Sequence, residues 1–232
     1  MIQRLDWDSA FFGRETGRLD IGRGPFSEAV IPATYSFVYV FSDHLLSDEE
    51  LNVERGTIHL ADEKRVYYKE LSSVSPIAAS VLSFEVTRTI PDRLLELAIQ
   101  SGHYSRFSTD PHLSPEYFEQ LYTTWLKRSV SREIADEVFV YETEGQIRGF
   151  VTLGMKAGRP DIGLIAVHSD DRSSGIGATL MQAAENWASI TMKSNHIQVV
   201  TQGANEGACR FYERNGYTVD TVSYVYHWWN KN

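Results

Sequence analysis

The sequence predicts an α/β protein of the α+β kind, in which a smaller N-terminal α/β domain precedes a larger domain with a central sheet. Hydrophobic spacing changes repeatedly along the chain between strand-like alternation and helix-like 3.6-residue periodicity. A strand pattern at 161–167 runs directly into a glycine-containing loop and then into a helical pattern. A helix start near Thr89, with Pro91 in its first turn, follows a region of short β-like runs. We therefore predict domains at 1–88 and 89–232.

The N-terminal region contains a β-like run at 35–41 and an acidic stretch at 47–50. The acidic stretch is typical of a solvated helix start, because it has no His or Asp partners at metal-ligand spacing. Helices are predicted at 89–99 and 114–127. Apolar residues of the second helix recur at helical spacing, which indicates a face packed in the core.

The remaining pattern alternates strands and helices. Strands at 138–142 and 146–153 flank a turn at 143–145, and a further turn is predicted at Arg159 and Pro160 before the strand at 161–167. After the loop come a helix, a strand at 196–201 and a short helix at 205–213. If the strands at 161–167 and 196–201 are parallel, the connection between them must be a right-handed crossover. The runs 217–219 and 223–229 are predicted to pair as a hairpin.

Composition narrows the classes of partner and compartment. The 232-residue chain has 22 Lys and Arg against 31 Asp and Glu, a net charge of −9 that disfavours nucleic acid as a partner. Cys209 is the single cysteine, which excludes an internal disulfide and a paired-cysteine zinc site, and we expect no metal. No signal peptide or membrane-spanning segment is visible, so we predict a cytoplasmic protein without membrane insertion.

The loop at 172–177 has the features of a phosphate site. A helix N-terminus presents unpaired N–H groups and a partial positive charge, glycines allow close approach, and Arg172 adds a fixed charge. A P-loop would need Gly-Lys-Ser/Thr, but Ala178 and Thr179 follow the second glycine. A dinucleotide fingerprint would need Gly or Ala at Leu180 and an acidic residue after the next strand. An ordinary strand-to-helix turn remains the alternative for the loop by itself.

The pattern Arg-x-x-Gly-x-Gly followed by Asn205-x-x-Ala208-x-x-Phe211-Tyr212-x-x-x-Gly216-Tyr217 resembles the GNAT superfamily of N-acetyltransferases. The resemblance spans roughly 89–229. It implies a GNAT fold with a mixed, splayed central sheet flanked by helices, and acetyl-CoA as co-substrate. It also implies that the backbone of the strand at 164–167 pairs with the pantetheine arm of CoA and that the loop at 172–178 binds the pyrophosphate. Asn205 would contact the pantetheine side. The implied cofactor-binding residues are Leu164, Ile165, Ala166, Val167, Arg172, Ser173, Ser174, Gly175, Ile176, Gly177, Ala178, Asn205 and Tyr212.

Two further segments, 5–13 and 101–107, resemble acetyltransferases that act on nucleotide-linked amino sugars in cell-surface polysaccharide biosynthesis. Those enzymes also have a smaller N-terminal α/β domain. The resemblance implies an acceptor site near Tyr104, Arg106 and Phe107, where the arginine could pair with a nucleotide diphosphate. A surface ion pair is the other interpretation of Arg106.

Direct acyl transfer needs a neutral amine, a donor to the developing oxyanion and an acid for the departing thiolate. Tyr212 matches the family's tyrosine and is the candidate acid; a core aromatic is the alternative. The resemblance places the oxyanion donor among backbone N–H groups near 165–167. Asp161, His168 and a water chain are the candidates for the base. Cys209 has no visible base beside it, which favours a buried small residue over an acyl-cysteine mechanism.

The sequence therefore predicts an acetyl-CoA-dependent N-acetyltransferase whose acceptor is a small-molecule amine, and the resemblance implies a nucleotide-linked amino sugar. Acetylation of a protein N-terminus or of another small amine is one alternative. A non-catalytic acyl-CoA-binding module is another. Whether the protein forms a homodimer stays open.

Overall fold

The computed structural model describes residues 1–72, 74 and 76–231, which form two compact units. Unit 1 comprises 1–65, 202–204 and 221–232, and unit 2 comprises 66–201 and 205–220. Two long strands, β4 (Gly56–Glu70) and β10 (Thr218–Asn230), contribute residues to both units. The domain boundary predicted near residue 88 stays a prediction. Ser73, Ser75 and Asn232, which the predicted domains include, lie outside the described residues.

Unit 1 is built on a mixed set of strands in the order β1-β2-β3-β10-β4. β2 and β3 are parallel, whereas β1 pairs antiparallel with β2, and β10 pairs antiparallel with β3. Its core joins Val38, Val40, Tyr226 and Trp228 to Leu19 of β2. The remaining elements are β1 (Gln3–Arg4), α1 (Asp6–Phe12), β2 (Thr16–Gly22), the 3-10 helix η1 (Glu28–Val30), β3 (Phe37–Ser42) and α2 (Asp48–Leu51).

The acidic stretch at 47–50 begins a helix, as predicted. The Ser47 side chain accepts from the Glu50 backbone N–H, and the Glu50 carboxylate accepts from the Ser47 backbone N–H, so the two residues form a capping box. This acidic stretch therefore has a structural explanation.

Unit 2 contains a mixed sheet in the order β10-β4-β9-β8-β7-β6-β5. The β6–β7 hairpin turns at Glu144 and Gly145, and the β7–β8 hairpin at Ala157 and Gly158. All four turn residues have positive φ, which matches the right-handed twist of the flanking strands. The strands are β5 (Val81–Ser83), β6 (Glu137–Thr143), β7 (Gln146–Lys156), β8 (Arg159–Val167) and β9 (His196–Gln202).

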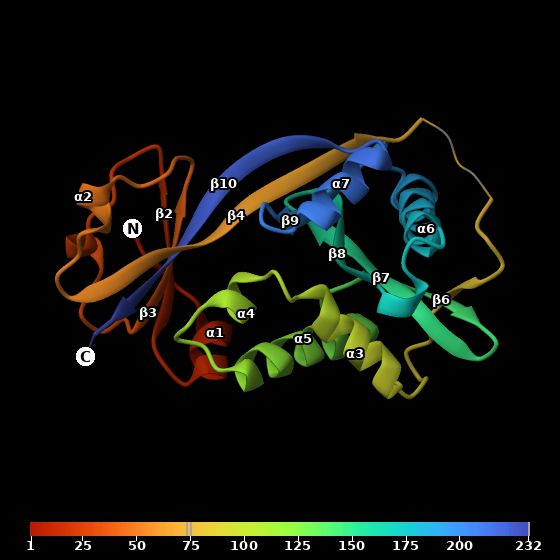
Figure 1. The fold of residues 1–232 in the computed structure, drawn as a ribbon, viewed down its shortest axis with the longest axis horizontal. Helices are drawn as coiled ribbons and strands as arrows, with labels where there is room; N and C mark the ends of the chain where they lie inside the picture. Colours follow the sequence, from red (N-terminus) through yellow and green to blue (C-terminus); the bar gives the residue numbers. More distant parts are fainter. Residues whose placement is uncertain (73, 75, 232) are drawn as a thin grey trace. The chain divides into compact units, whose positions relative to one another are not determined.

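Helices cover both faces of the unit 2 sheet (Figure 1). One core contains Val151 and Ile162 together with residues of α6 and α7, and the other contains Phe150 and Ala166 together with residues of α3 and α5. Successive residues of a strand thus enter opposite cores, as the pleat requires. The helices are α3 (Asp92–Ser101), α4 (Arg106–Thr109), α5 (Pro115–Val130), α6 (Ile176–Ile190) and α7 (Glu206–Arg214), with the 3-10 helix η2 (Ser169–Asp171). Within the described residues, no helix is long and apolar enough to cross a membrane.

Three sequence predictions about elements were wrong. Apart from Tyr217, the runs 217–219 and 223–229 belong to the single strand β10, whose residues from Tyr224 to Trp229 pair with β3. The turn predicted at Arg159 and Pro160 lies two residues earlier, so both residues belong to β8. Pro91 caps α3 and is not in its first turn.

Candidate active site

The loop before α6 is exposed and shaped for an anion. Ser173 and Gly175 have φ values of 62° and 87°, so the chain reverses direction twice through the left-handed region. Gly175 caps α6 and has no side chain that could accept a hydrogen bond from the first-turn N–H groups. These N–H groups are therefore presented to solvent at the positive end of a 15-residue helix. An oxyanion such as a phosphate is the ligand that such a terminus favours.

The two glycines of the loop have different roles. Gly175 needs its positive φ and has open space around the position of a Cβ atom. Gly177 lies within the helix, and a Cβ atom there would lie 3.0 Å from Cε2 of Phe211 in α7. Gly177 therefore allows α6 to pack closely on α7, and its part in the approach of a ligand stays a prediction.

Arg148 of β7 anchors the segment before the loop through hydrogen bonds and an ion pair. Its guanidinium donates to Oδ1 of Asp171 at 2.8 Å and to Oγ1 of Thr143 at 2.6 Å. Its backbone carbonyl accepts from the His168 N–H at 2.8 Å. The ion pair is partly buried, with the side chains 28% and 20% exposed, so it is less screened than a surface pair. It ties the loop to the β6–β7 hairpin.

Replacing Arg148 with Met should raise the KM for acetyl-CoA by about threefold to tenfold and leave kcat within twofold, because the loop loses its tether while the catalytic groups stay in place. Steady-state kinetics with varied acetyl-CoA would measure this. Arg159→Met is the matched control, since Arg159 forms a 2.8 Å pair with Asp220 at a more exposed position. An equal rise in KM in both variants would contradict the role of Arg148.

β8 and β9 separate toward the loop. In these two strands, both described in full, the paired residues are Asp161 with Gln198 and Ile162 with Val199. A β-bulge follows at once: the register with β7 shifts between Val151 and Leu153, and the Leu164 N–H donates to Oγ1 of Thr152. From Gly163 onward β8 therefore has no partner strand on its β9 side. This opening is the splay that the family resemblance implies.

Register shows which backbone groups face the opening. The His168 N–H bonds to the Arg148 carbonyl, and alternation along an antiparallel pair then places the polar groups of Ala166 toward β7. The backbone N–H and C=O groups of Ile165 and Val167 therefore point to the opposite edge of β8, which β9 leaves open. The side-chain amide of Gln100 in α3 donates to the Val167 carbonyl at 2.8 Å. The open edge could pair with an extended ligand as if with an additional strand.

Tyr212 lies in α7 and is 4% exposed. Its ring centroid is 5.6 Å from that of Tyr67, whose hydroxyl donates to Glu213 at 3.0 Å. Burial raises the pKa of Tyr212, with further contributions from Cys209 and Asp161. The phenol is therefore protonated across the neutral range, the form that a general acid requires.

Asn205 and His168 both cap helices. Oδ1 of Asn205 accepts from the Ala208 N–H at 3.1 Å, so the amide nitrogen is the group that could donate to a ligand. Nδ1 of His168 accepts from the Asp170 N–H at 3.3 Å, which gives this histidine a structural role at η2. Cys209 is buried among the residues that pack around Tyr212.

The three residues predicted for the acceptor site differ in exposure. Tyr104 is 51% exposed, whereas Phe107 is 5% exposed and meets Trp125 edge-on at 5.8 Å. The guanidinium of Arg106 lies 4.5 Å from the Phe107 ring centroid. Phe107 thus supports α4 from the core, while Tyr104 is the member available to solvent. Their role toward an acceptor stays a prediction.

Gln100, Arg148 and Asp171 were not predicted from the sequence. Each acts through one contact between segments that are distant in the chain, such as Gln100 with Val167 and Arg148 with Asp171. Neither contact has a local motif. Only the register of β7 with β8 and the packing of α3 could have revealed them.

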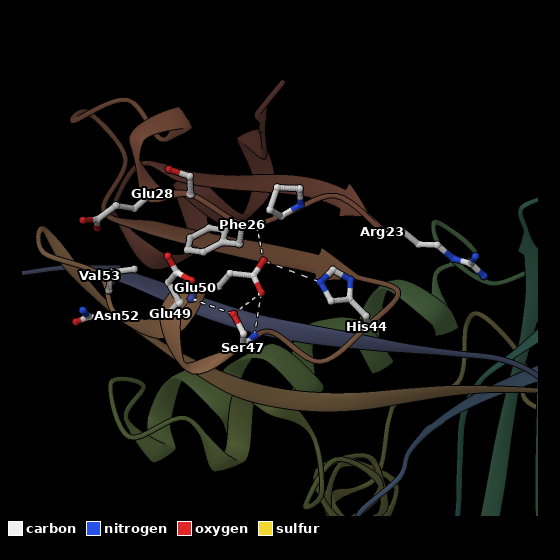
Figure 2. A pocket seen from close by; sticks show the side chains of 11 residues that line it. Arg23, Phe26, Glu28, His44, Ser47, Glu49, Glu50, Asn52 and Val53 are labelled. Atoms are coloured by element: carbon white, nitrogen blue, oxygen red, sulfur yellow. Dashed lines mark hydrogen bonds and ion pairs between the residues drawn. The ribbon is translucent and has the colours of Figure 1, made fainter.

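A cavity of about 630 Å³ lies in unit 1, between α2 and the segment around Phe26 (Figure 2). Two of its three carboxylates, those of Glu28 and Glu50, already have partners. Glu50 accepts from the N–H groups of Ser47 and Phe26, and Glu28 accepts from those of Glu54 and Arg55. These bonds fix loops, so we assign the cavity no chemistry.

Glu50→Ala should lower the free energy of unfolding by about 1 to 2 kcal/mol at pH 7, because it removes the capping box and the bond to Phe26. Hydrogen bonds from Ser47 and Phe26 hold the pKa of Glu50 below its ordinary value of 4.5. Its stabilisation is therefore complete above pH 4.5 and is lost as the pH falls through the lower folded-state pKa. Denaturant unfolding at pH 7 and pH 3 would measure this, with exposed Glu49→Ala as control. A difference that persists at pH 3 would contradict the charge contribution.

The match to a known family agrees with this geometry. Residues 135–219 match the acetyltransferase (GNAT) domain. This segment contains β8, the anion-binding loop, α6, β9 and α7. The chain belongs to the GNAT family and is therefore an acyltransferase. Members of this family use acetyl-CoA as the acetyl donor. The predicted family and fold class are confirmed.

The proteins similar to the chain include two curated acetyltransferases and a solved structure. The chain is 24% identical over 242 residues to the dTDP-fucosamine acetyltransferase of Escherichia coli O6:H1, with 96% of each chain covered. It is 31% identical over 123 residues to streptothricin acetyltransferase A of Bacillus subtilis, covering 50% of this chain and 69% of that protein. A solved GNAT-family structure from Novosphingobium aromaticivorans has a TM-score of 0.57 at 9% identity, covering 84% of this chain and 75% of the other. This last likeness is one of fold.

Proposed function

We propose that the protein transfers the acetyl group of acetyl-CoA to the amine of a nucleotide-linked amino sugar of the dTDP-fucosamine type. The observation that carries the acceptor is the similarity to dTDP-fucosamine acetyltransferase, which extends over 96% of both chains and so includes unit 1. The matched GNAT segment by itself would explain only residues 135–219. A cytoplasmic location and a place in cell-surface polysaccharide biosynthesis belong to the same proposal.

The binding of the donor would use the loop and the open strand edge. The first-turn N–H groups of α6 and Arg172 would hold the pyrophosphate. Ile165 and Val167 would pair with the amides of the pantetheine arm, and Asn205 would donate from its amide nitrogen. Among the residues implied for this strand, Ala166 bonds to β7 through its backbone, so its contact would be through the side chain. The acetyl carbonyl would lie near the bulge.

Acyl transfer then requires the amine to attack the thioester carbonyl. A backbone N–H near Ile165 would stabilise the oxyanion, and the protonated phenol of Tyr212 would give its proton to the departing thiolate. Protonation at the moment of bond cleavage lowers the barrier, because a free thiolate is the poorer leaving group.

Release of free CoA thiol, followed spectrophotometrically, tests the proposal. The acceptors are a dTDP-4-amino-4,6-dideoxy sugar, the same amino sugar without the nucleotide, a polyamine and a peptide amine. We expect kcat/KM to be highest for the nucleotide sugar, and at least tenfold lower for the free sugar because the nucleotide contributes binding energy. Preference for the polyamine or peptide would contradict the sugar assignment.

A small cationic amine is a second candidate acceptor, favoured by the 31% identity to streptothricin acetyltransferase A. The net charge of −9 suits a cationic acceptor. Preference for the polyamine in the same assay, falling steeply as salt is added, would support this candidate.

A further inference from the structure

Asp161 and Gln198 form a buried polar pair at the start of β8 and β9. Their side chains are 7% and 6% exposed, and Nε2 of Gln198 donates to Oδ1 of Asp161 at 2.9 Å. The same nitrogen donates to the Lys156 carbonyl at 3.4 Å. Because both partners are acceptors, the orientation of the Gln198 amide is fixed. A buried carboxylate held in this way needs a reason, since its burial costs free energy.

This pair lies where the opening between the strands ends. Asp161 with Gln198 and Ile162 with Val199 are the paired positions, and β8 is open from Gly163 to the loop. An extended ligand arm that binds along β8 from the loop would span about 13 Å over four residues. It would end where the pairing of Ile162 with Val199 joins β8 to β9. The reactive end of the arm would therefore stop beside Gly163.

Asp161 and Tyr212 approach this point from opposite faces of the sheet. Ile162 and Val199 belong to the core that contains Tyr212. Strand alternation then places Asp161 and Gly163 on the other face. Gly163 is exposed although its neighbours Asp161 and Ile162 are buried, and it has no side chain to cover the position. An acceptor could reach the reactive end past the exposed Gly163 backbone, beside Oγ1 of Thr152, which lies 2.9 Å from the position of a Cβ.

We infer that Asp161 is the general base that deprotonates the acceptor ammonium, and that Gln198 is the positioning residue that holds its carboxylate. This inference rests on the proposed acetyltransferase function and names a residue that the function leaves unassigned. Base and acid on opposite faces suit the reaction, because the carboxylate has to meet the amine while the phenol has to meet the thioester sulfur.

The protons balance over one turnover. The Asp161 carboxylate takes one proton from the ammonium, and the neutral nitrogen forms the C–N bond. When the C–S bond breaks, the thiolate takes the proton of Tyr212, and the tyrosinate takes the remaining surplus proton from the new amide nitrogen. Asp161 releases its proton to solvent. The products are the N-acetyl amide and free CoA.

The groups that face this pair come from several elements. Asp161, Cys209 of α7 and Tyr67 of β4 are the titratable groups that act electrostatically on Tyr212. Gln198 of β9 and the Lys156 carbonyl of β7 are uncharged partners. Burial raises the pKa of Tyr212, so the phenol stays protonated across the neutral range. A titration seen on the acidic side of the rate profile would then belong to the base or to the amine.

Asp161→Asn tests the inference, because asparagine keeps an oxygen that can accept from Gln198. We expect kcat/KM at pH 7 to fall at least tenfold, with the deficit shrinking toward pH 9.5 as the amine loses its proton without help. The KM for acetyl-CoA should stay within twofold. Asp220→Asn is the matched control and should behave as the wild type, since its partner Arg159 lies at the surface.

Gln198→Leu provides a second readout. Loss of a hydrogen bond to the charged carboxylate raises its pKa, so the acidic limb of the pH–rate profile should move to higher pH. A deficit of Asp161→Asn that is equal at every pH, or no deficit, would overturn the inference and leave the proposed function standing. Wild-type protein that acetylates no amine of the panel would overturn the proposed function itself. If it accepts only a different amine, the same variants are measured with that amine.

Discussion

Tyr212→Phe should lower kcat by about 100-fold to 1000-fold and leave the affinity for CoA within twofold. The substitution removes one hydroxyl from a side chain that is 4% exposed and keeps the ring that packs against Tyr67. General-acid contributions are typically of this size, and the loss should appear in kcat because the proton is needed only in the transition state. Single-turnover kinetics and calorimetric titration with CoA would separate the two quantities.

Tyr217→Phe is the matched control for this prediction. Tyr217 is 2% exposed in the same core, and its ring centroid is 6.2 Å from that of Tyr212. Either substitution removes one hydroxyl from a buried ring of the same core, so a loss of turnover confined to Tyr212→Phe identifies the acid. Because burial raises the pKa of Tyr212, wild-type activity should show no alkaline decline caused by its ionisation. Unchanged turnover in Tyr212→Phe would show that another group supplies the proton.

Gly175→Val should weaken CoA binding by about 30-fold to 100-fold. A β-branched residue at φ 87° is strained, so the loop would move to relieve the strain and withdraw the first-turn N–H groups of α6 from the position of the anion. The expected loss corresponds to about 2 to 3 kcal/mol of binding free energy. Calorimetric titration with CoA would measure it.

Gly158→Val separates strain from binding. Gly158 has a φ of 78° in the β7–β8 turn and, like Gly175, has no atom within 4 Å of the position of a Cβ. Both variants should lose similar amounts of unfolding free energy, about 1 to 2 kcal/mol, but only Gly175→Val should lose CoA affinity. Equal losses of affinity would mean that the loop has no special part in binding.

Much of unit 2 could be predicted because its signals are local. The turn at Glu144 and Gly145, the proline that begins α5 and the glycine before α6 each act over a few residues. The family pattern covers the loop and α7, so the candidate acid was also accessible from the sequence.

Other features depend on pairing between distant segments. The segment that forms β4 mixes polar and apolar residues without clear alternation, and its burial pattern is equally irregular. The polar residues between 217 and 223 resembled a turn, but from Thr218 onward they belong to the continuous strand β10, which lies between β3 and β4 in the sheet. The bulge at Thr152 and the bond from Gln100 to Val167 likewise follow from register and packing. Asp161 was one of three candidate bases until its burial and its pairing with Gln198 set it apart.

The sharing of β4 and β10 by the two units limits how this protein can be divided. Unit 2 includes residues 66–70, and unit 1 includes residues 221–231. A fragment that begins at residue 89 would therefore lack part of one unit, and a fragment that ends at residue 88 would lack the strand next to β3. Exchange of acceptor specificity between relatives should work through substitutions within a whole chain, because no single cut separates one unit from the other.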